Sequence, residues 1–146
     1  DMAARLVLHP LDFIQVAAAF YKGQYTSDVG QGPVRRDRSG IEVFLNRFRF
    51  SLKGEYIFAK DGQTSGEGWY VQGGYFILSK KLQSIIKYDS YDKDREMAGD
   101  RSEVMTIGLN LFFTENTKFQ INYELHRQEP GNRSNSALLA QFQAGF

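Results

Sequence analysis

The stretch KFQINYELH, residues 118–126, decides the fold. Phe119, Ile121, Tyr123 and Leu125 alternate with residues that are all polar. Successive side chains of an extended strand point to opposite faces, so this stretch predicts a strand with one apolar and one polar face.

The same alternation recurs through the chain. Residues 50–58, 105–113 and 140–146 repeat it, and the last of these ends on an aromatic residue, Phe146. We therefore predict an all-β chain with about eight strands and one remnant. The expected segments are 2–8, 12–25, 40–46, 49–61, 67–78, 81–93, 103–113, 117–128 and 136–146.

Short and long links between these segments are expected to alternate. Short links are predicted at 9–11, near Arg47, at 79–80 and at 114–116, and longer polar links at 26–39, 62–66, 94–102 and 129–135. Outer-membrane β-barrels place short turns on one side and long loops on the other. The order of the links therefore favours an antiparallel up-and-down barrel.

Composition excludes several classes of protein. The 18 basic and 17 acidic residues leave a net charge of +1, which provides no field to attract nucleic acid. The longest apolar run falls far short of the roughly 18 residues of a spanning helix. There is no cysteine, and no cluster of acid, base and nucleophile indicates an enzyme. We expect no cofactor and no bound metal.

The long polar side chains on the polar face favour water inside the barrel and lipid outside it. The aromatic residues near strand ends are expected to form girdles at the membrane surface. They are Tyr21, Tyr25, Tyr88, Tyr91, Phe112, Phe113 and Phe146. The first segment has no turn before it, so we expect that residues 1–146 are the C-terminal portion of a single, larger barrel domain.

Two alternatives stay open. A small, self-closing barrel of eight strands would have a structural, adhesin or binding role, because side chains would fill its interior. A soluble β-sandwich would use the same alternation to bind a ligand. Arg35-Arg36-Asp37-Arg38 is predicted to lie in an exposed loop, and the spacing of Asp92, Asp94 and Glu103 only weakly resembles a calcium loop.

Several motifs together resemble the phosphate-selective porin O and P family. They include Leu52-Lys53-Gly54-Glu55-Tyr56, Gly68-Trp69-Tyr70-Val71-Gln72-Gly73-Gly74-Tyr75, Lys87-Tyr88-Asp89-Ser90-Tyr91-Asp92 and Thr106-Ile107-Gly108-Leu109-Asn110. The resemblance continues through Asn122-Tyr123-Glu124 to Gln141-Phe142-Gln143. It implies a trimeric channel of sixteen strands per subunit in the bacterial outer membrane, of which this chain would supply the C-terminal half.

The expected function is passive diffusion of small polar or anionic solutes, phosphate among them. The expected partners are the lipid bilayer, lipopolysaccharide and two further copies of the chain. Charged rings set ion preference in such channels. The predicted pore-lining residues are Arg49, Lys53, Glu55, Lys87, Gln120, Asn122 and Glu124. Acidic residues are mixed with basic ones on the polar face, which weakens the case for anion selectivity.

Overall fold

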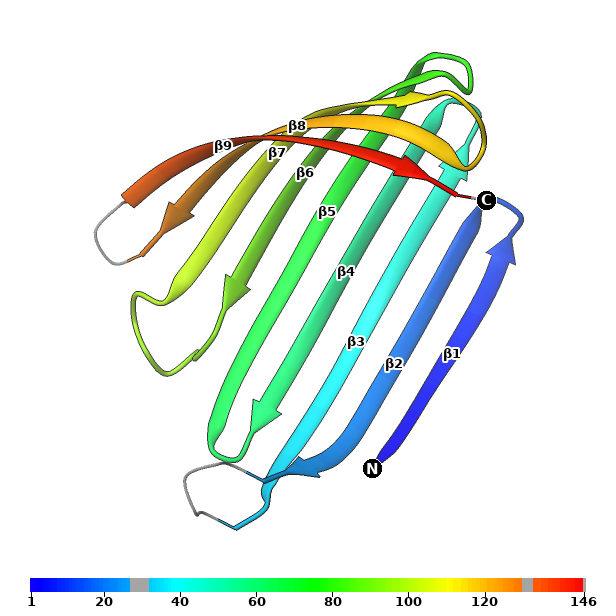
Figure 1. The fold of residues 1–146 in the computed structure, drawn as a ribbon. Coiled ribbons are helices and arrows are strands. Elements are labelled where there is room, and N and C mark those ends of the chain that lie inside the picture. Colours follow the sequence, from blue (N-terminus) through cyan, green and yellow to red (C-terminus); the bar gives the residue numbers. More distant parts are fainter. Residues whose placement is uncertain (27–31, 130–132, 146) are drawn as a thin grey trace.

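The computed structural model describes residues 1–26, 32–129 and 133–145. These residues form one antiparallel sheet of nine strands in chain order (Figure 1). The strands are β1 (Met2–Leu11), β2 (Ile14–Tyr25), β3 (Val34–Arg47), β4 (Phe50–Asp61), β5 (Thr64–Leu78), β6 (Leu82–Asp92), β7 (Arg101–Phe112), β8 (Thr117–Gln128) and β9 (Arg133–Ala144). The described part of the chain has no helix long and apolar enough to cross a membrane.

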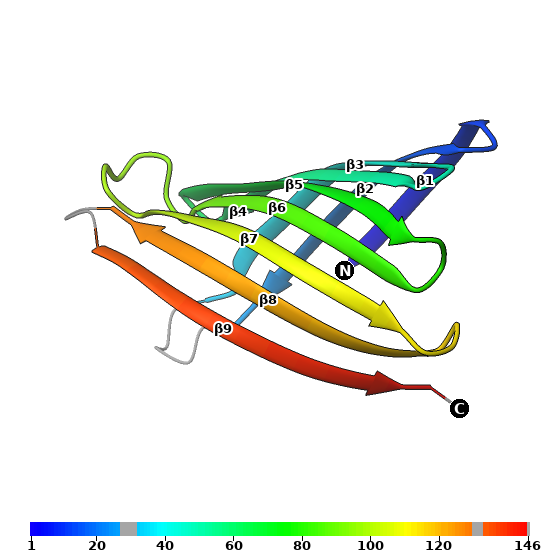
Figure 2. The same ribbon diagram turned by 90° about the horizontal axis from the view of Figure 1, so that it is seen from above.

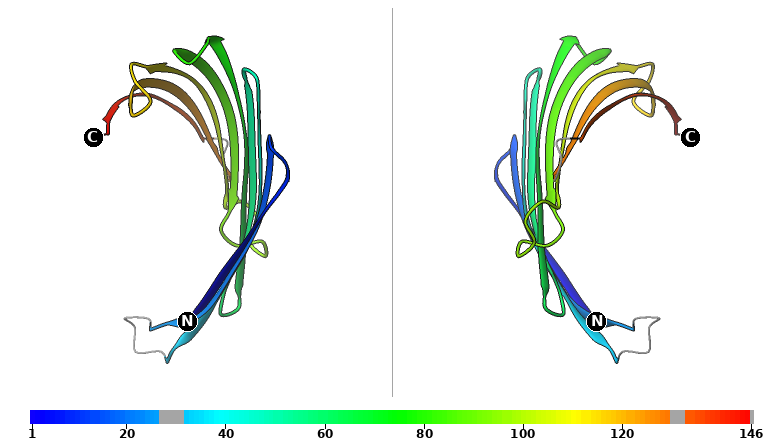
Figure 3. Two further views of the ribbon diagram at one scale, coloured as in Figure 1. Left: turned by 90° about the vertical axis from the view of Figure 1, so that its right-hand side faces the viewer. Right: turned by 90° about the vertical axis from the view of Figure 1, so that its left-hand side faces the viewer.

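Each strand pairs with its neighbours in sequence, so the predicted up-and-down order is confirmed. The strands β1 and β9 lie at opposite borders of the sheet (Figure 2) and do not pair with each other. Seen from the side, the sheet curls into an open arc (Figure 3). The fold is therefore that of a porin-type sheet which the described residues do not close.

The sheet has almost no buried apolar core. Among the described residues the buried apolar side chains are Ala17 and Ile85, at 4% and 8% exposure. Large apolar side chains such as Leu6, Ile41 and Ile107 are instead exposed on one face. A soluble sandwich needs a second sheet to cover that face, and the described residues form only one. The sandwich alternative therefore does not agree with the fold.

The polar face is the concave one. Side chains on the inside of a curved sheet are crowded, and glycine relieves that crowding. A Cβ at Gly74 would lie 2.5 Å from Ser51 Oγ, and a Cβ at Gly108 would lie 2.9 Å from Ile85 Cγ1. Both glycines are on the polar face. On the apolar face the nearest atoms to a Cβ at Gly54 or Gly73 are at 3.5 and 3.7 Å, which is ordinary contact.

Three predicted links are wrong. The short link expected at 9–11 belongs to β1, which continues to Leu11, and the turn follows it at residues 12–13. The segment 62–66 was expected to be a long link, but β4 and β5 are joined by a tight turn in which Gly62 has a φ of 61°. Short and long links therefore do not alternate strictly. The segment 26–39 was also expected to be a loop, but β3 already begins at Val34 and pairs with β2 from there. The predicted terminal aromatic, Phe146, lies outside the described residues.

Replacing Gly108 by valine is expected to destabilise the sheet by about 1 to 3 kcal/mol, because the new side chain overpacks the concave face. Its Cβ would also lie 3.1 Å from the backbone oxygen of Ile121. The matched change Gly73→Val meets only ordinary contacts and places a β-branched residue on the open face. The midpoints of guanidinium unfolding measure both changes, and equal losses would contradict a concave polar face.

Candidate functional site

A continuous row of polar side chains crosses the middle of the polar face. The strand pairing places Lys53 opposite Gln72, Gln72 opposite Lys87, Lys87 opposite Thr106, and Thr106 opposite Glu124. We call these five residues the central row. Three of the predicted pore-lining residues, Lys53, Lys87 and Glu124, therefore occupy one line across five strands.

Both lysines of the central row lie beside the ring of Tyr70. The Nζ atoms of Lys53 and Lys87 are 5.7 and 4.7 Å from the ring centroid, within range of a cation–π contact. Each ammonium group also has a carboxylate partner. Lys87 Nζ lies 2.6 Å from Asp89 Oδ1, and Lys53 Nζ lies 3.8 Å from Glu42 Oε2. The cations of the central row are therefore neutralised locally.

A second charged cluster lies on the polar face where β3 and β4 approach their loop-side ends. Arg38 Nη2 is 2.7 Å from Asp61 Oδ2, and Arg36 Nε is 3.3 Å from Asp61 Oδ1. The guanidinium of Arg36 also stacks over Tyr25, at 4.2 Å from the ring centroid. Residues 35–38, which were predicted to be an exposed loop, thus belong to β3, because the pairing between β2 and β3 continues to Val34.

The side chains of Arg35-Arg36-Asp37-Arg38 alternate between the two faces of the sheet. Arg36 and Arg38 lie on the polar face, whereas Arg35 and Asp37 lie on the apolar face and pair with each other at 2.8 Å. Only half of the predicted cluster can therefore contact solutes on the polar face.

The other predicted pore-lining residues are divided between the sheet and a turn. Glu55, Gln120 and Asn122 share the polar face with the central row. Arg49 lies in the turn between β3 and β4, where its Nη1 atom donates to the backbone oxygen of Ile77 at 3.5 Å. The structure thus brings six of the seven residues to one face and leaves Arg49 at its edge.

Aromatic residues at strand ends do not all lie where the sequence predicted. Tyr21, Tyr25, Tyr91 and Phe112 are on the polar face and so form no outward girdle. The apolar face instead carries aromatic pairs near both of its borders. They are Phe50–Tyr75, with ring centroids 4.7 Å apart, near the short turns, and Trp69–Tyr88, at 5.5 Å, nearer the loops.

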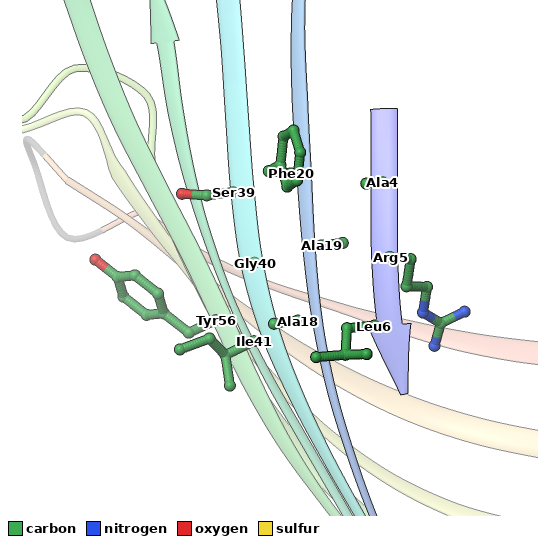
Figure 4. Close-up of a pocket in the computed structure, with 10 residues that line it drawn as sticks. All are labelled: Ala4, Arg5, Leu6, Ala18, Ala19, Phe20, Ser39, Gly40, Ile41 and Tyr56. Atoms are coloured by element: carbon green, nitrogen blue, oxygen red, sulfur yellow. The ribbon is translucent and has the colours of Figure 1, made fainter. Parts of the chain in front are cut away.

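The apolar face is hollowed across β1 to β4. A depression of about 490 Å³ lies there, and the small side chains of Ala4, Ala18 and Ser39 are part of its lining. Leu6 and Ile41 also line it, as Figure 4 shows. Its lining is mainly apolar, so it belongs to the apolar face rather than to a polar solute site.

Arginines in and beside the loop between β6 and β7 pair with carboxylates of β5 and β6. Arg101 Nη2 lies 3.5 Å from Asp92 Oδ2, and Arg95 Nε lies 3.4 Å from Glu67 Oε2. Asp94 Oδ1 accepts a hydrogen bond from the backbone N–H of Glu96. Within the described ranges no three His, Cys, Asp or Glu side chains are grouped to hold a metal ion.

Sequence reasoning missed Tyr70 and Gln72 as parts of the polar face, and it placed Thr106 on that face without selecting it as a pore-lining residue. The adjacent Gly73 and Gly74 obscure the alternation of β5, although Tyr70 and Gln72 follow its period of two. Thr106 lies on the polar face at 5% exposure between two charged neighbours. Continuing the period through the glycines would have identified the first two residues.

Comparisons with known proteins agree with this geometry. The family model of phosphate-selective porin O and P matches residues 21–145. Comparison with curated proteins and with solved structures gave no match. The match covers most of the chain, including β3 to β9 and the whole central row, and it implies a channel rather than an enzyme. The chain belongs to the phosphate-selective porin O and P family.

Proposed function

We propose that this chain forms part of the wall of an outer-membrane diffusion channel. In this proposal the apolar face contacts lipid, and the polar face lines a water-filled lumen that conducts small polar or anionic solutes. The observation that carries the proposal is the separation of the two faces on a curved, coreless sheet. A concave polar face and an exposed convex apolar face match the wall of a porin and not that of a soluble barrel.

The dimensions of the apolar face support a membrane location. Residues 69–77 of β5 span about 26 Å along the strand, and strands tilted by about 40° would turn this into a band about 20 Å tall. The aromatic pairs Phe50–Tyr75 and Trp69–Tyr88 lie near the two borders of this band. Aromatic side chains prefer such interfaces because one part of the ring system is apolar and the other is hydrated.

The free edges of β1 and β9 require partners in a bilayer, since no water there can satisfy exposed backbone groups. We propose that further strands of the same barrel pair with both edges, up to the sixteen strands of the family, and that three such barrels associate. On the convex face Lys22 and Lys60 lie beyond the apolar band, where they would contact lipopolysaccharide phosphates.

The cations of the proposed lumen are held in ion pairs, in which one carboxylate serves two cations. Asp61 pairs with Arg36 and Arg38, while Glu42 pairs with Lys53 and also with Arg5, at 3.4 Å. Rings of unpaired cations would be needed for strong anion selection. This wall therefore admits anions, phosphate included, without selecting them strongly.

Conductance of the full-length protein in a planar bilayer tests the proposal. Stepwise openings are expected, with a small reversal potential under a KCl gradient because the wall charges are paired. A folded protein that inserts and stays silent would contradict the channel, and would instead favour a closed barrel.

A lysine at position 121 is expected to destabilise the membrane-inserted protein by about 2 to 4 kcal/mol, the cost of a cation on the lipid face near mid-bilayer. Ile121 is 42% exposed on the apolar face, whereas its neighbour Gln120 is on the polar face. Gln120→Lys is therefore the matched control and should cost little. Unfolding in lipid vesicles measures both, and two equally tolerated lysines would argue against a lipid-facing apolar face.

The change Asp61→Asn is expected to shift the reversal potential toward that of chloride, because Arg36 and Arg38 would lose their shared carboxylate. Asp37→Asn removes the same charge from the opposite face, where Asp37 pairs with Arg35. That control should leave ion preference unchanged. Equal shifts in both variants would show that the cluster at Asp61 does not face the conducting path.

A further inference from the structure

Four amide side chains lie side by side on the polar face near the short turns. The strand pairing places Gln83 opposite Asn110, Asn110 opposite Gln120, and Gln120 opposite Gln141. We call these four residues of β6 to β9 the amide row. The strands themselves are neighbours in Figure 1. Such a run of one chemical type differs from the charged central row, which lies four residues away along the strands.

The first two residues of the amide row, Gln83 and Asn110, belong to a chain of side-chain hydrogen bonds. Asn110 Nδ2 donates to Gln83 Oε1 at 3.1 Å, and Gln83 Nε2 donates to Ser51 Oγ at 3.5 Å. These bonds fix the orientation of the first two amides. Gln120 and Gln141 form no side-chain hydrogen bond with any other described residue. Their donors and acceptors are therefore free to bind a solute.

Between β5 and β9 the amide row and the next row toward the sheet centre carry no ionisable side chain, whereas Lys118, opposite Phe112, lies beside the amide row on the side of the short turns. The amide row continues onto Phe76 of β5, and the neighbouring row toward the sheet centre consists of Gly74, Ile85, Gly108, Asn122 and Leu139. A charged solute would find no counter-ion within these two rows. An uncharged solute would therefore not compete with ions for binding to these two rows.

An apolar surface adjoins the amides. The rings of Phe76 and Phe112 lie with centroids 5.8 Å apart, and the strand pairing places Phe76 directly opposite Gln83. Binding sites for small polar molecules combine such an apolar surface with a few fixed polar groups. The apolar C–H face of a sugar ring fits an aromatic surface, while its hydroxyls need partners that both donate and accept hydrogen bonds. Amides do both.

We infer that the amide row, with Phe76 and Phe112, binds neutral polyhydroxylated solutes such as short oligosaccharides. This inference rests on the proposed function, because it assumes that the polar face lines the solute path. It names a solute class other than the anions suggested by the family description. The charged central row and the uncharged amide row would then contact different solutes along one lumen.

Saturation-transfer NMR of the full-length protein folded in detergent, with maltotriose as the probe, tests the inference. Transfer to the sugar is expected, and inorganic phosphate at equal concentration should not abolish it. The double change Gln83→Leu with Gln120→Leu should weaken maltotriose binding about tenfold, since each lost hydrogen bond costs a factor of a few. Absence of transfer to the wild-type protein would overturn the inference.

Gln72→Leu is the matched control, because Gln72 is an amide of the same face that lies in the central row. It should leave maltotriose binding unchanged, and an equal loss in this variant would also overturn the inference. Where the double variant does not fold, Gln120→Ala alone is expected to weaken binding about threefold. Gln120→Asn retains the amide and should restore part of that loss.

Conductance separates this inference from the proposed function. A protein that conducts ions but does not bind maltotriose would overturn the inference alone. A protein that binds maltotriose through the amide row but never conducts would overturn the channel and retain the binding site.

Discussion

The unbroken antiparallel pairing from β1 to β9 is the constraint on which the rest of the structure depends. Side chains alternate along each strand, so the pairing decides which residues share a face. A slip of one residue in β4, β6 or β8 would move Lys53, Lys87 or Glu124 onto the apolar face. The central row, the amide row and the apolar band all follow from this single register.

The consequence is a sheet whose stability does not come from a buried core. Almost no apolar side chain of the described residues is buried, and the large ones cover the convex face. Such a sheet would be unstable in water, because an apolar surface of this extent would favour aggregation. In the proposed membrane location, lipid against the convex face would remove that cost, while glycines such as Gly74 and Gly108 allow the polar face to curve inward.

Much of the fold could be predicted from the sequence because period-two alternation is a local property. It predicted β8 within a residue of its observed bounds, and it placed Lys53, Lys87 and Glu124 on polar faces of their strands. Their alignment into one row could not be predicted, because register depends on pairing between strands. The ion pair between Arg38 and Asp61 was missed for the same reason.

The errors also have physical causes. The polar residues 35–38 were predicted to be a loop by their composition, but the backbone hydrogen bonds of β3 do not depend on side-chain polarity. The turn at Gly62 is short because a left-handed glycine reverses the chain in few residues. Tyr21 and Tyr91 were assigned to an outward girdle because they lie near strand ends. The alternation of side chains along the strand nevertheless places both on the polar face.

The central claim is that the apolar face meets lipid and the polar face meets water. Spin labels at residues 118–125 of β8, one per variant in the full-length protein in lipid vesicles, test this claim most directly. At the apolar positions collisions with oxygen should be frequent, and those with a water-soluble nickel chelate rare. The polar positions should show the reverse. If the apolar positions were inaccessible to both reagents, they would be buried in protein and the account would be wrong.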